Sequence, residues 1–152
     1  VVMVSSNAHT MAPKDGIQFD DLAGTRGKAD MGTYGHSKLA NLLFAKELSR
    51  RFAGTKKTAN AVHPGVIHTN LGRNTNPVFM FFFGLLGPLV LKSVAQGAAT
   101  EVFVATNPAL ATTSGEYFAD CNVAKARADA DDVVMARRLW EVSERIVAGL
   151  PV

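Results

Sequence analysis

Residues 33–65 read TYGHSKLANLLFAKELSRRFAGTKKTANAVHPG, a helical pattern followed by a strand pattern. Apolar side chains recur three and four residues apart over 33–52, which is the spacing of one helix face. Gly54 follows this run, as glycine commonly does just past the end of a helix. The apolar segment 58–62 then predicts a buried strand, which ends at the turn that begins with His63.

A second apolar run lies at the start of the chain. Residues 1–5 (VVMVS) predict a strand buried in a sheet, and a strand, a helix and a strand within this length form a parallel crossover unit. Because the run begins without a methionine or a preceding turn, we expect the chain to be a fragment that enters a sheet in its middle. We also expect a helix over 93–106, a strand over 116–119 and a closing helix over 131–148 that packs on the sheet. The predicted fold is therefore α/β, the later part of a doubly wound parallel sheet, in one partial domain over 1–152.

The composition indicates a soluble globular domain. Of 152 residues, 47% are hydrophobic and 19% are charged, which suits a chain with a sizeable core. The net charge of +3 comes from basic residues scattered in pairs rather than gathered in one stripe, so we expect no nucleic-acid partner. Cys121 is the only cysteine, which excludes an intrachain disulfide and a thiolate metal cluster. The histidines show no metal-ligand spacing with carboxylates, and we expect no metal site.

Tyr34 and Lys38 form the first candidate catalytic pair. Four residues apart on the predicted helix, they share one face, with β-carbons about 5–6 Å apart. A free phenol has a pKa of about 10, too high for acid–base work at neutral pH, and a neighbouring ammonium lowers it by stabilising the phenolate. Because this spacing also occurs by chance in many helices, the pair alone leaves a plain surface role open.

Two predicted strand ends strengthen the case for this pair. Ser6 follows the first strand, where ligands of parallel sheets collect, and its hydroxyl can stabilise charge on a substrate oxygen. The turn 63–65 ends the next strand at the same edge, and Thr69 follows where a loop can approach a cofactor. The convergence of these residues with the start of the helix predicts a shared active-site crevice.

Four short motifs are spaced along the chain: VSS at 4–6, YGHSKLAN at 34–41, NAVHPG at 60–65 and TNL at 69–71. Together they resemble the short-chain dehydrogenase/reductase family, and within it the retinol-dehydrogenase-like branch. QGAAT at 96–100 and GEYFADC at 115–121 look like the plant enzymes associated with the chloroplast translocon and like their bacterial relatives. The family's glycine-rich dinucleotide turn, G-x-G-x-x-G, does not occur in the chain, so the resemblance implies the C-terminal half of a Rossmann-type enzyme without its dinucleotide-binding half.

The resemblance implies a role for each candidate residue. Ser6 polarises the substrate carbonyl or alcohol, with Ser5 as the alternative on the opposite side of the strand. Tyr34 transfers the proton, and Lys38 stabilises the phenolate and binds the ribose hydroxyls. The cofactor-binding residues are Tyr34 and Lys38 together with Pro64, Gly65, Val66 and Thr69.

The apolar segment 77–95 falls where the family has a substrate lid. Its aromatic residues are Phe79, Phe81, Phe82 and Phe83. They predict a wall over an apolar substrate pocket or a segment that dips into a membrane surface, with burial in the core as the alternative. Gly84, Gly87 and Pro88 interrupt the run, which falls short of the roughly 20 apolar residues of a membrane span.

The function implied by the resemblance is that of an NADP(H)-dependent oxidoreductase, with NAD as the alternative cofactor. It interconverts an alcohol and a carbonyl on an apolar, retinoid- or lipid-like substrate. The isolated chain is expected to be inactive because it lacks the dinucleotide turn. A catalytically silent scaffold or regulatory partner that keeps the fold is the second hypothesis. We expect a cytoplasmic protein, or a chloroplast one at the inner envelope if the source is a plant, with a homodimer and peripheral membrane contact as further associations.

Overall fold

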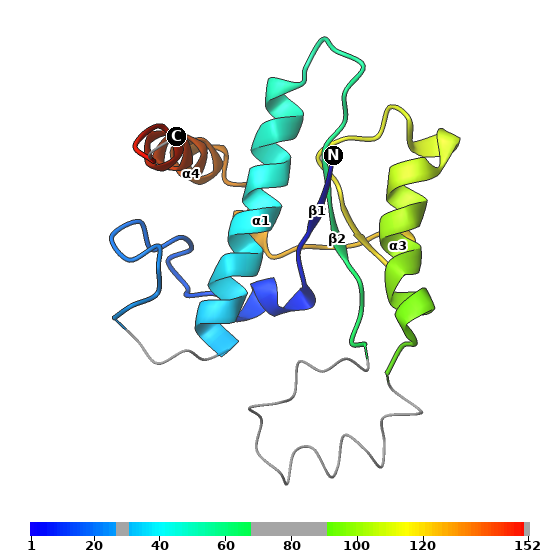
Figure 1. Ribbon diagram of the computed structural model, residues 1–152, viewed down its shortest axis with the longest axis horizontal. Helices are drawn as coiled ribbons and strands as arrows, with labels where there is room; N and C mark the ends of the chain where they lie inside the picture. The colour runs from blue at the N-terminus through cyan, green and yellow to red at the C-terminus, as the bar shows by residue number, and fades with distance from the viewer. Residues whose placement is uncertain (27–30, 68–90, 151–152) are drawn as a thin grey trace, which may run out of the picture.

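The structure is a computed structural model that describes residues 1–26, 31–67 and 91–150. Within these residues a four-stranded sheet lies between the helices α1 (Met31–Arg51) and α3 (Val94–Thr106), as Figure 1 shows. The α/β class predicted from the sequence is confirmed.

The strands, in spatial order, are β1 (Val2–Val4), β2 (Asn60–His63), β3 (Tyr117–Ala119) and β4 (Asn122–Val123). β1 pairs with β2 and β2 with β3, both in parallel, which confirms the predicted crossover. β4 is antiparallel to β3, and no sequence pattern predicts it because two residues carry no periodicity. Asp120 and Cys121 connect the two strands in a tight turn with φ angles of 51° and 59°.

Side-chain caps mark the starts of α3 and α4. The Ser93 hydroxyl accepts a hydrogen bond from the Gln96 amide at 3.2 Å, and the Gln96 side chain accepts one from the Ser93 amide at 2.8 Å, a capping box for α3. The carboxylate of Asp132 accepts from the Met135 amide at 2.9 Å and caps α4 (Val133–Ala148). The helices α1, α3 and α4 confirm the helices predicted over 33–52, 93–106 and 131–148. Among the described helices, none has the length and hydropathy needed to cross a membrane.

The sheet separates two clusters of buried side chains. One face buries residues of α1, β2 and β3, among them Leu39, Leu42, Leu43, Ala61 and Tyr117. The next residues along the two strands, Val62 and Phe118, face the other cluster together with Val104 of α3. Successive side chains of a strand point to opposite faces, so each strand contributes to both cores.

α4 packs against α1 rather than on the sheet. Trp140 stacks on Phe44 with ring centroids 4.7 Å apart, and the Arg51 guanidinium lies 4.4 Å from the centre of the Trp140 ring. In Figure 1, α4 lies beyond α1, on the side away from β1. The expectation that the closing helix packs on the sheet is therefore wrong, because α1 already covers that part of the sheet and presents its outer face instead.

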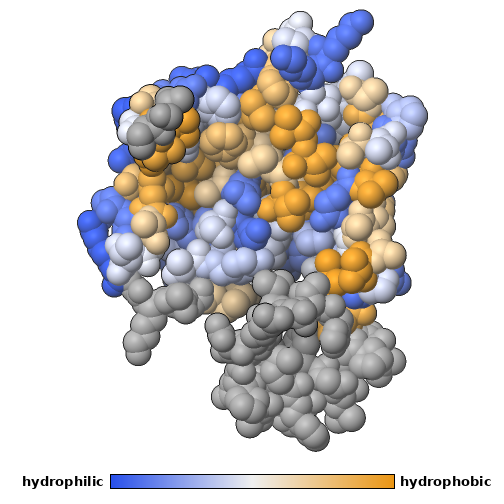
Figure 2. Space-filling view, in the orientation of Figure 1, coloured by the Kyte–Doolittle hydropathy of each residue, from blue (hydrophilic) through white to orange (hydrophobic). Residues whose placement is uncertain are grey.

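β1 forms one edge of the described sheet. The sequence predicts a buried strand here, but Val1 is 57% exposed and Val4 is 44% exposed. The reason is that β1 pairs with a strand on one side only among the described residues. The space-filling view shows an apolar area over this edge (Figure 2).

Candidate active site

The carboxyl end of β1 and the first turns of α1 meet at one edge of the sheet. The Lys38 amine donates to the Val4 carbonyl at 3.3 Å, and the Asn41 side-chain amide donates to the same carbonyl at 2.9 Å. In return, the Ser5 hydroxyl donates to the Lys38 carbonyl at 2.7 Å. These contacts tie α1 to β1 and bring Lys38 next to the strand end that Ser6 follows.

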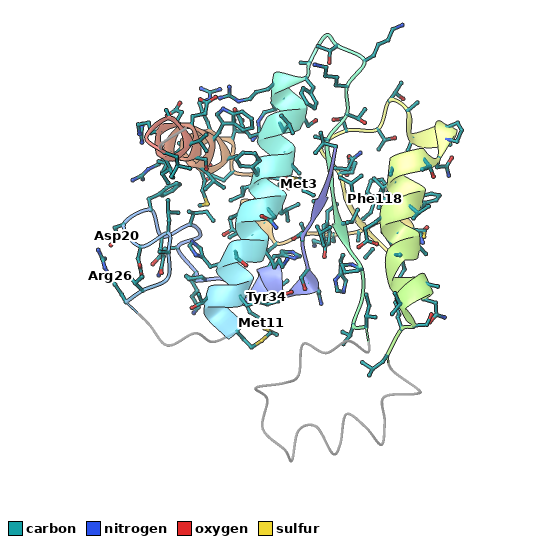
Figure 3. The ribbon with its side chains drawn as sticks, viewed as in Figure 1. Met3, Met11, Asp20, Arg26, Tyr34 and Phe118 are labelled. Atoms are coloured by element: carbon teal, nitrogen blue, oxygen red, sulfur yellow. The ribbon has the colours of Figure 1, made fainter. Side chains whose placement is uncertain are left out.

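Tyr34 and Lys38 lie on one face of α1, as their spacing predicts. The Lys38 amine is 5.4 Å from the centroid of the Tyr34 ring, within the range at which a cation is attracted to an aromatic face. Tyr34 is 44% exposed, so its ring is open to a bound molecule. Figure 3 shows it near the start of α1, beside Met11. A phenol that is open to bound molecules can exchange a proton with a ligand.

Ser5 and Ser6 have different surroundings. Ser5 is 1% exposed, and its hydroxyl proton is committed to the Lys38 carbonyl. Ser6 is half-buried and caps the 3₁₀ helix η1 (Asn7–Met11), and its hydroxyl oxygen accepts from the Ala8 amide at 3.2 Å. An accepted hydrogen bond leaves the hydroxyl proton available for donation. The environment therefore suits Ser6, rather than Ser5, to donate to a substrate oxygen.

Gly35 allows α1 to touch η1. A β-carbon at this position would lie 2.5 Å from the Ala8 carbonyl oxygen and 2.8 Å from the Ala12 nitrogen. Both atoms belong to the backbone, so no side chain fits without moving η1. Gly35 therefore brings the helix that carries Tyr34 against the segment that begins at Ser6.

The carboxyl end of β2 lies next to the carboxyl end of β1. Gly65 has a φ angle of +91°, and the Lys92 side chain fills the space where a β-carbon would lie. The Lys92 amide donates to the Val66 carbonyl at 2.8 Å, and Val66 is 51% exposed. Burial, reinforced by the Lys92 ammonium, lowers the pKa of His63.

Lys92 and Asp120 are functional candidates that the predicted site does not include. Their side chains form an ion pair at the carboxyl end of β3, and this pair lowers the pKa of Asp120. Asp120 directly follows a predicted parallel strand, so the rule that selects Ser6 would also have selected it. Lys92 carries no such signal, because only the fold brings it over Gly65.

Part of the predicted site lies outside the described residues. This applies to Thr69, Phe79, Phe81, Phe82 and Phe83. The predicted lid over 77–95 is described only from residue 91 onward, and its role stays a prediction. Among the residues that the structure describes, no three His, Cys, Asp or Glu side chains gather in a way that could hold a metal ion.

Curated relatives match nearly all of the chain, whereas no protein-family model does. The short-chain dehydrogenase TIC 32 A, chloroplastic, of Brassica napus is 40% identical over 153 residues, covering 99% of this chain and 48% of the relative. Retinol dehydrogenase 14 of Homo sapiens is 38% identical over 152 residues, covering 99% and 44%. Retinol dehydrogenase 11 of Homo sapiens is 40% identical over 152 residues, covering 100% and 46%. The chain thus spans about half the length of these relatives.

A solved structure shows the same fold. The crystal structure of an uncharacterized protein from Mycobacterium paratuberculosis superposes with a TM-score of 0.69 at 29% identity, covering 100% of this chain and 52% of that chain. The match corresponds to the C-terminal part of the Rossmann-type fold, as predicted. On this sequence identity and this fold, the chain belongs to the short-chain dehydrogenase family, among relatives that include retinol dehydrogenases and chloroplastic short-chain dehydrogenases.

Proposed function

We propose that residues 1–152 form the catalytic half of an NADP(H)-dependent oxidoreductase that interconverts an alcohol and a carbonyl on an apolar substrate. One observation carries the proposal. The Lys38 amine lies over the Tyr34 ring and also donates to the Val4 carbonyl at the end of β1, two residues before Ser6. The names of the retinol dehydrogenases among the relatives support the reaction class. We call these residues joined to a dinucleotide-binding half the complete protein.

Each of the three residues has a distinct part in the reaction. In the reducing direction, Ser6 donates a hydrogen bond to the carbonyl oxygen, and the Tyr34 hydroxyl gives that oxygen its proton as negative charge develops. In the oxidising direction, Tyr34 accepts the proton from the alcohol. The Lys38 ammonium stabilises the phenolate in both directions. The nicotinamide, when bound, supplies or accepts the hydride.

The described residues suit a dinucleotide. An ammonium has three N–H donors, and the Lys38 amine directs one to the Val4 carbonyl, so others can bind ribose hydroxyls next to Tyr34. Pro64, Gly65 and Val66 follow β2 at the same edge, where ligands of parallel sheets bind. Together with Thr69, they complete the proposed cofactor-binding set. The preference for NADP over NAD rests on the resemblance to retinol dehydrogenases.

Two exposed methionines support an apolar substrate. Met11 and Met31 are each 55% exposed, and Met31 lies three residues before Tyr34 on α1. Figure 3 places Met11 beside Tyr34 at the end of η1. Large apolar side chains left open around a proton donor form the kind of surface that binds retinoid- or lipid-like molecules.

Location and association are proposed on the same footing. We propose a cytoplasmic protein or, for a plant source, a chloroplast protein, because two relatives are chloroplastic by name. A homodimer and a peripheral membrane contact complete this part of the proposal.

Replacement of Tyr34 tests the proposed reaction. In the complete protein, Tyr34→Phe removes only the hydroxyl, and we expect kcat for NADPH-dependent carbonyl reduction to fall about 10²–10⁴-fold, the contribution of a positioned proton donor. NADPH affinity, measured by the quenching of protein fluorescence, should change little, which excludes unfolding as the cause.

Tyr117→Phe is the matched control. Tyr117 is 3% exposed and its hydroxyl has no hydrogen-bond partner among the described residues, so its removal should leave kcat unchanged. Unaltered turnover in Tyr34→Phe would refute the proposed chemistry and favour the scaffold hypothesis.

A further inference from the structure

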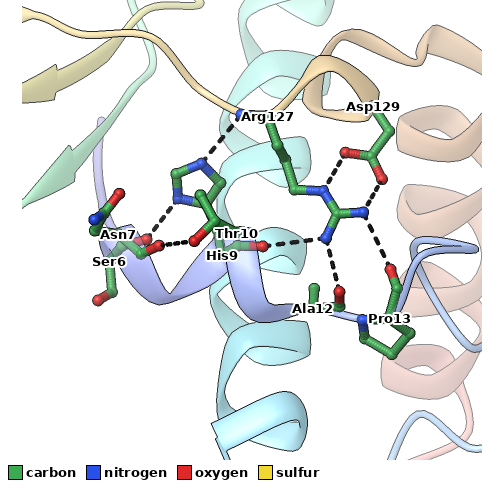
Figure 4. Close-up of polar contacts among 8 residues, drawn as sticks. All are labelled: Ser6, Asn7, His9, Thr10, Ala12, Pro13, Arg127 and Asp129. Atoms are coloured by element: carbon green, nitrogen blue, oxygen red, sulfur yellow. Dashed lines mark hydrogen bonds and ion pairs between the residues drawn. The ribbon is translucent and has the colours of Figure 1, made fainter.

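One arginine side chain binds several backbone carbonyls at the end of the segment that begins at Ser6. The Arg127 guanidinium donates to the Ala12 carbonyl at 2.9 Å, the Pro13 carbonyl at 3.1 Å and the His9 carbonyl at 3.3 Å (Figure 4). These carbonyls belong to the last turn of η1 and the residues after it. Arg127 therefore holds η1 at the end opposite to Ser6.

Asp129 orients this guanidinium. Its two carboxylate oxygens accept from Arg127 Nε at 2.5 Å and Nη2 at 2.7 Å, a bidentate pair. The side chains are only 17% and 25% exposed, so water competes weakly for the contacts. Because the guanidinium is planar, this pair directs its remaining N–H groups at the carbonyls of His9, Ala12 and Pro13.

His9 connects the same arginine to Ser6 directly. Its ring is fully buried and packs edge-on against Tyr117 with centroids 5.0 Å apart. Nε2 accepts from the Arg127 amide at 3.2 Å, so in the neutral ring the proton resides on Nδ1, which donates to the Ser6 carbonyl at 2.7 Å. Ser6 is thus joined through the His9 ring to Arg127, which lies 118 positions after His9 in the sequence.

These contacts constrain Ser6 from both ends of η1. The Ser6 carbonyl accepts from the His9 ring and from the His9 amide at 3.0 Å, while its hydroxyl accepts from Ala8. A catalytic hydroxyl displaced by about 1 Å can lower the rate about 10²-fold. The position of this hydroxyl therefore depends on how His9 and Arg127 hold the backbone of Ser6 and η1.

We propose that His9, Arg127 and Asp129 are positioning residues for Ser6: they form a clamp that holds η1 so that the serine hydroxyl points at the substrate oxygen. This inference rests on the proposed function, because it gives Ser6 a part in the reaction. In this proposal the clamp acts through Ser6 and not through a contact of its own with substrate or cofactor.

The first test is Arg127→Lys in the complete protein. Lysine keeps the charge but lacks the planar fork, so it cannot hold Asp129 and the η1 carbonyls together. We expect kcat to fall about 10–100-fold, with KM for NADPH unchanged. Arg26→Lys is the matched control, because Arg26 also binds a carboxylate and a carbonyl of Asp20 but does so on the surface, with both side chains more than 60% exposed. It should leave kcat unchanged.

The second test separates positioning from mere stabilisation. In a Ser6→Ala background, Arg127→Lys should lower kcat no further, since the hydroxyl that the clamp orients is already absent. An equal loss in both backgrounds would overturn the clamp while leaving the proposed reaction intact. If Ser6→Ala alone leaves kcat unchanged, the serine's role in the proposed function fails and the clamp fails with it. Should Arg127→Lys not fold, Asp129→Asn, which weakens the same pair, carries the same expectations.

Discussion

His36 joins the loop before α1 to the helix itself. The Gln18 amide donates to His36 Nε2 at 3.0 Å, and His36 is 7% exposed. A ring nitrogen accepts a hydrogen bond only when it carries no proton, so this contact requires a neutral ring. Burial lowers the pKa of His36, while the Asp21 carboxylate acts in the opposite direction.

Stability should therefore fall in mild acid. The unfolded chain titrates near the ordinary histidine value of 6.5 and the folded chain lower, so the unfolded state binds the proton first as the pH drops. The contribution of His36 is complete above about pH 6.5 and is lost as the pH falls through its folded pKa. In the complete protein, His36→Gln keeps an acceptor that does not titrate, and its urea midpoint should decrease less between about pH 7.5 and pH 5.5 than that of the unmodified protein.

His63 keeps the His36→Gln variant sensitive to acid. Its pKa is also lowered, so it continues to make the variant acid-sensitive, and the dependence should shrink rather than vanish. Identical pH dependence in the two proteins would show that His36 does not couple folding to protonation.

At the scale of the element, α1 has two faces with different tasks. One buries Leu39, Leu42 and Leu43 against the sheet and fixes how the helix is rotated. That rotation places the Lys38 amine both at the end of β1 and over the Tyr34 ring. The position of the helix along η1 depends on its close approach, which the absence of a side chain at residue 35 permits.

Gly35→Ala should harm both stability and turnover. Alanine favours a helix interior by about 0.8–1.0 kcal/mol over glycine, but forcing a methyl into packed backbone costs about 1–3 kcal/mol. Because the β-carbon would lie 2.5 Å from the Ala8 carbonyl, we expect the cost to dominate, with a net loss of about 1 kcal/mol in the free energy of unfolding. Urea denaturation of the complete protein measures this loss, and kcat should fall with it because Ser6 caps η1 and would move with it.

Gly149→Ala serves as the comparison for Gly35→Ala. Its β-carbon would lie no closer than 3.6 Å to the nearest atoms, an ordinary contact, so neither stability nor kcat should decrease appreciably. A stabilised Gly35→Ala protein with full activity would contradict the close approach of α1 to η1.

On the scale of the whole molecule, the site is assembled from segments far apart in the chain. Ser6 lies between β1 and η1, and α1 supplies Tyr34 and Lys38. The proposed clamp joins His9 of η1 to Arg127 and Asp129, which precede the C-terminal helix. The glycine-rich turn that holds a pyrophosphate in Rossmann-type enzymes has no counterpart in the 152 residues. In the proposed enzyme, the proposed catalytic residues therefore lie in this chain and the contacts to the pyrophosphate lie outside it.

The isolated chain should show no turnover. Without the dinucleotide turn it lacks the backbone amides and helix dipole that bind the pyrophosphate, so the nicotinamide would not stay next to Tyr34. NADPH oxidation, followed by absorbance with an apolar aldehyde as substrate, should not exceed the rate without protein. The complete protein assayed at the same concentration is the positive control. Substrate-dependent NADPH oxidation by the pure chain would contradict the prediction that the isolated chain is inactive.

Local patterns in the sequence were sufficient for the main elements and for the family. The helix that became α1 and the two strands beside it were predicted from apolar periodicity, which reports burial one turn or one residue away. The spacing of Tyr34 and Lys38 likewise requires only helical geometry, so the pair could be recognised before any fold was known.

Only the tertiary structure showed which serine keeps a proton to donate, that α4 packs on α1, and that Arg127 reaches the residues after Ser6. These contacts join residues dozens to more than one hundred positions apart, and no periodicity records them. Sequence patterns determine which faces are buried, because burial acts on each segment separately. Which elements those faces contact depends on how the segments pack together in the two cores. The same packing decides which partners the polar groups bind.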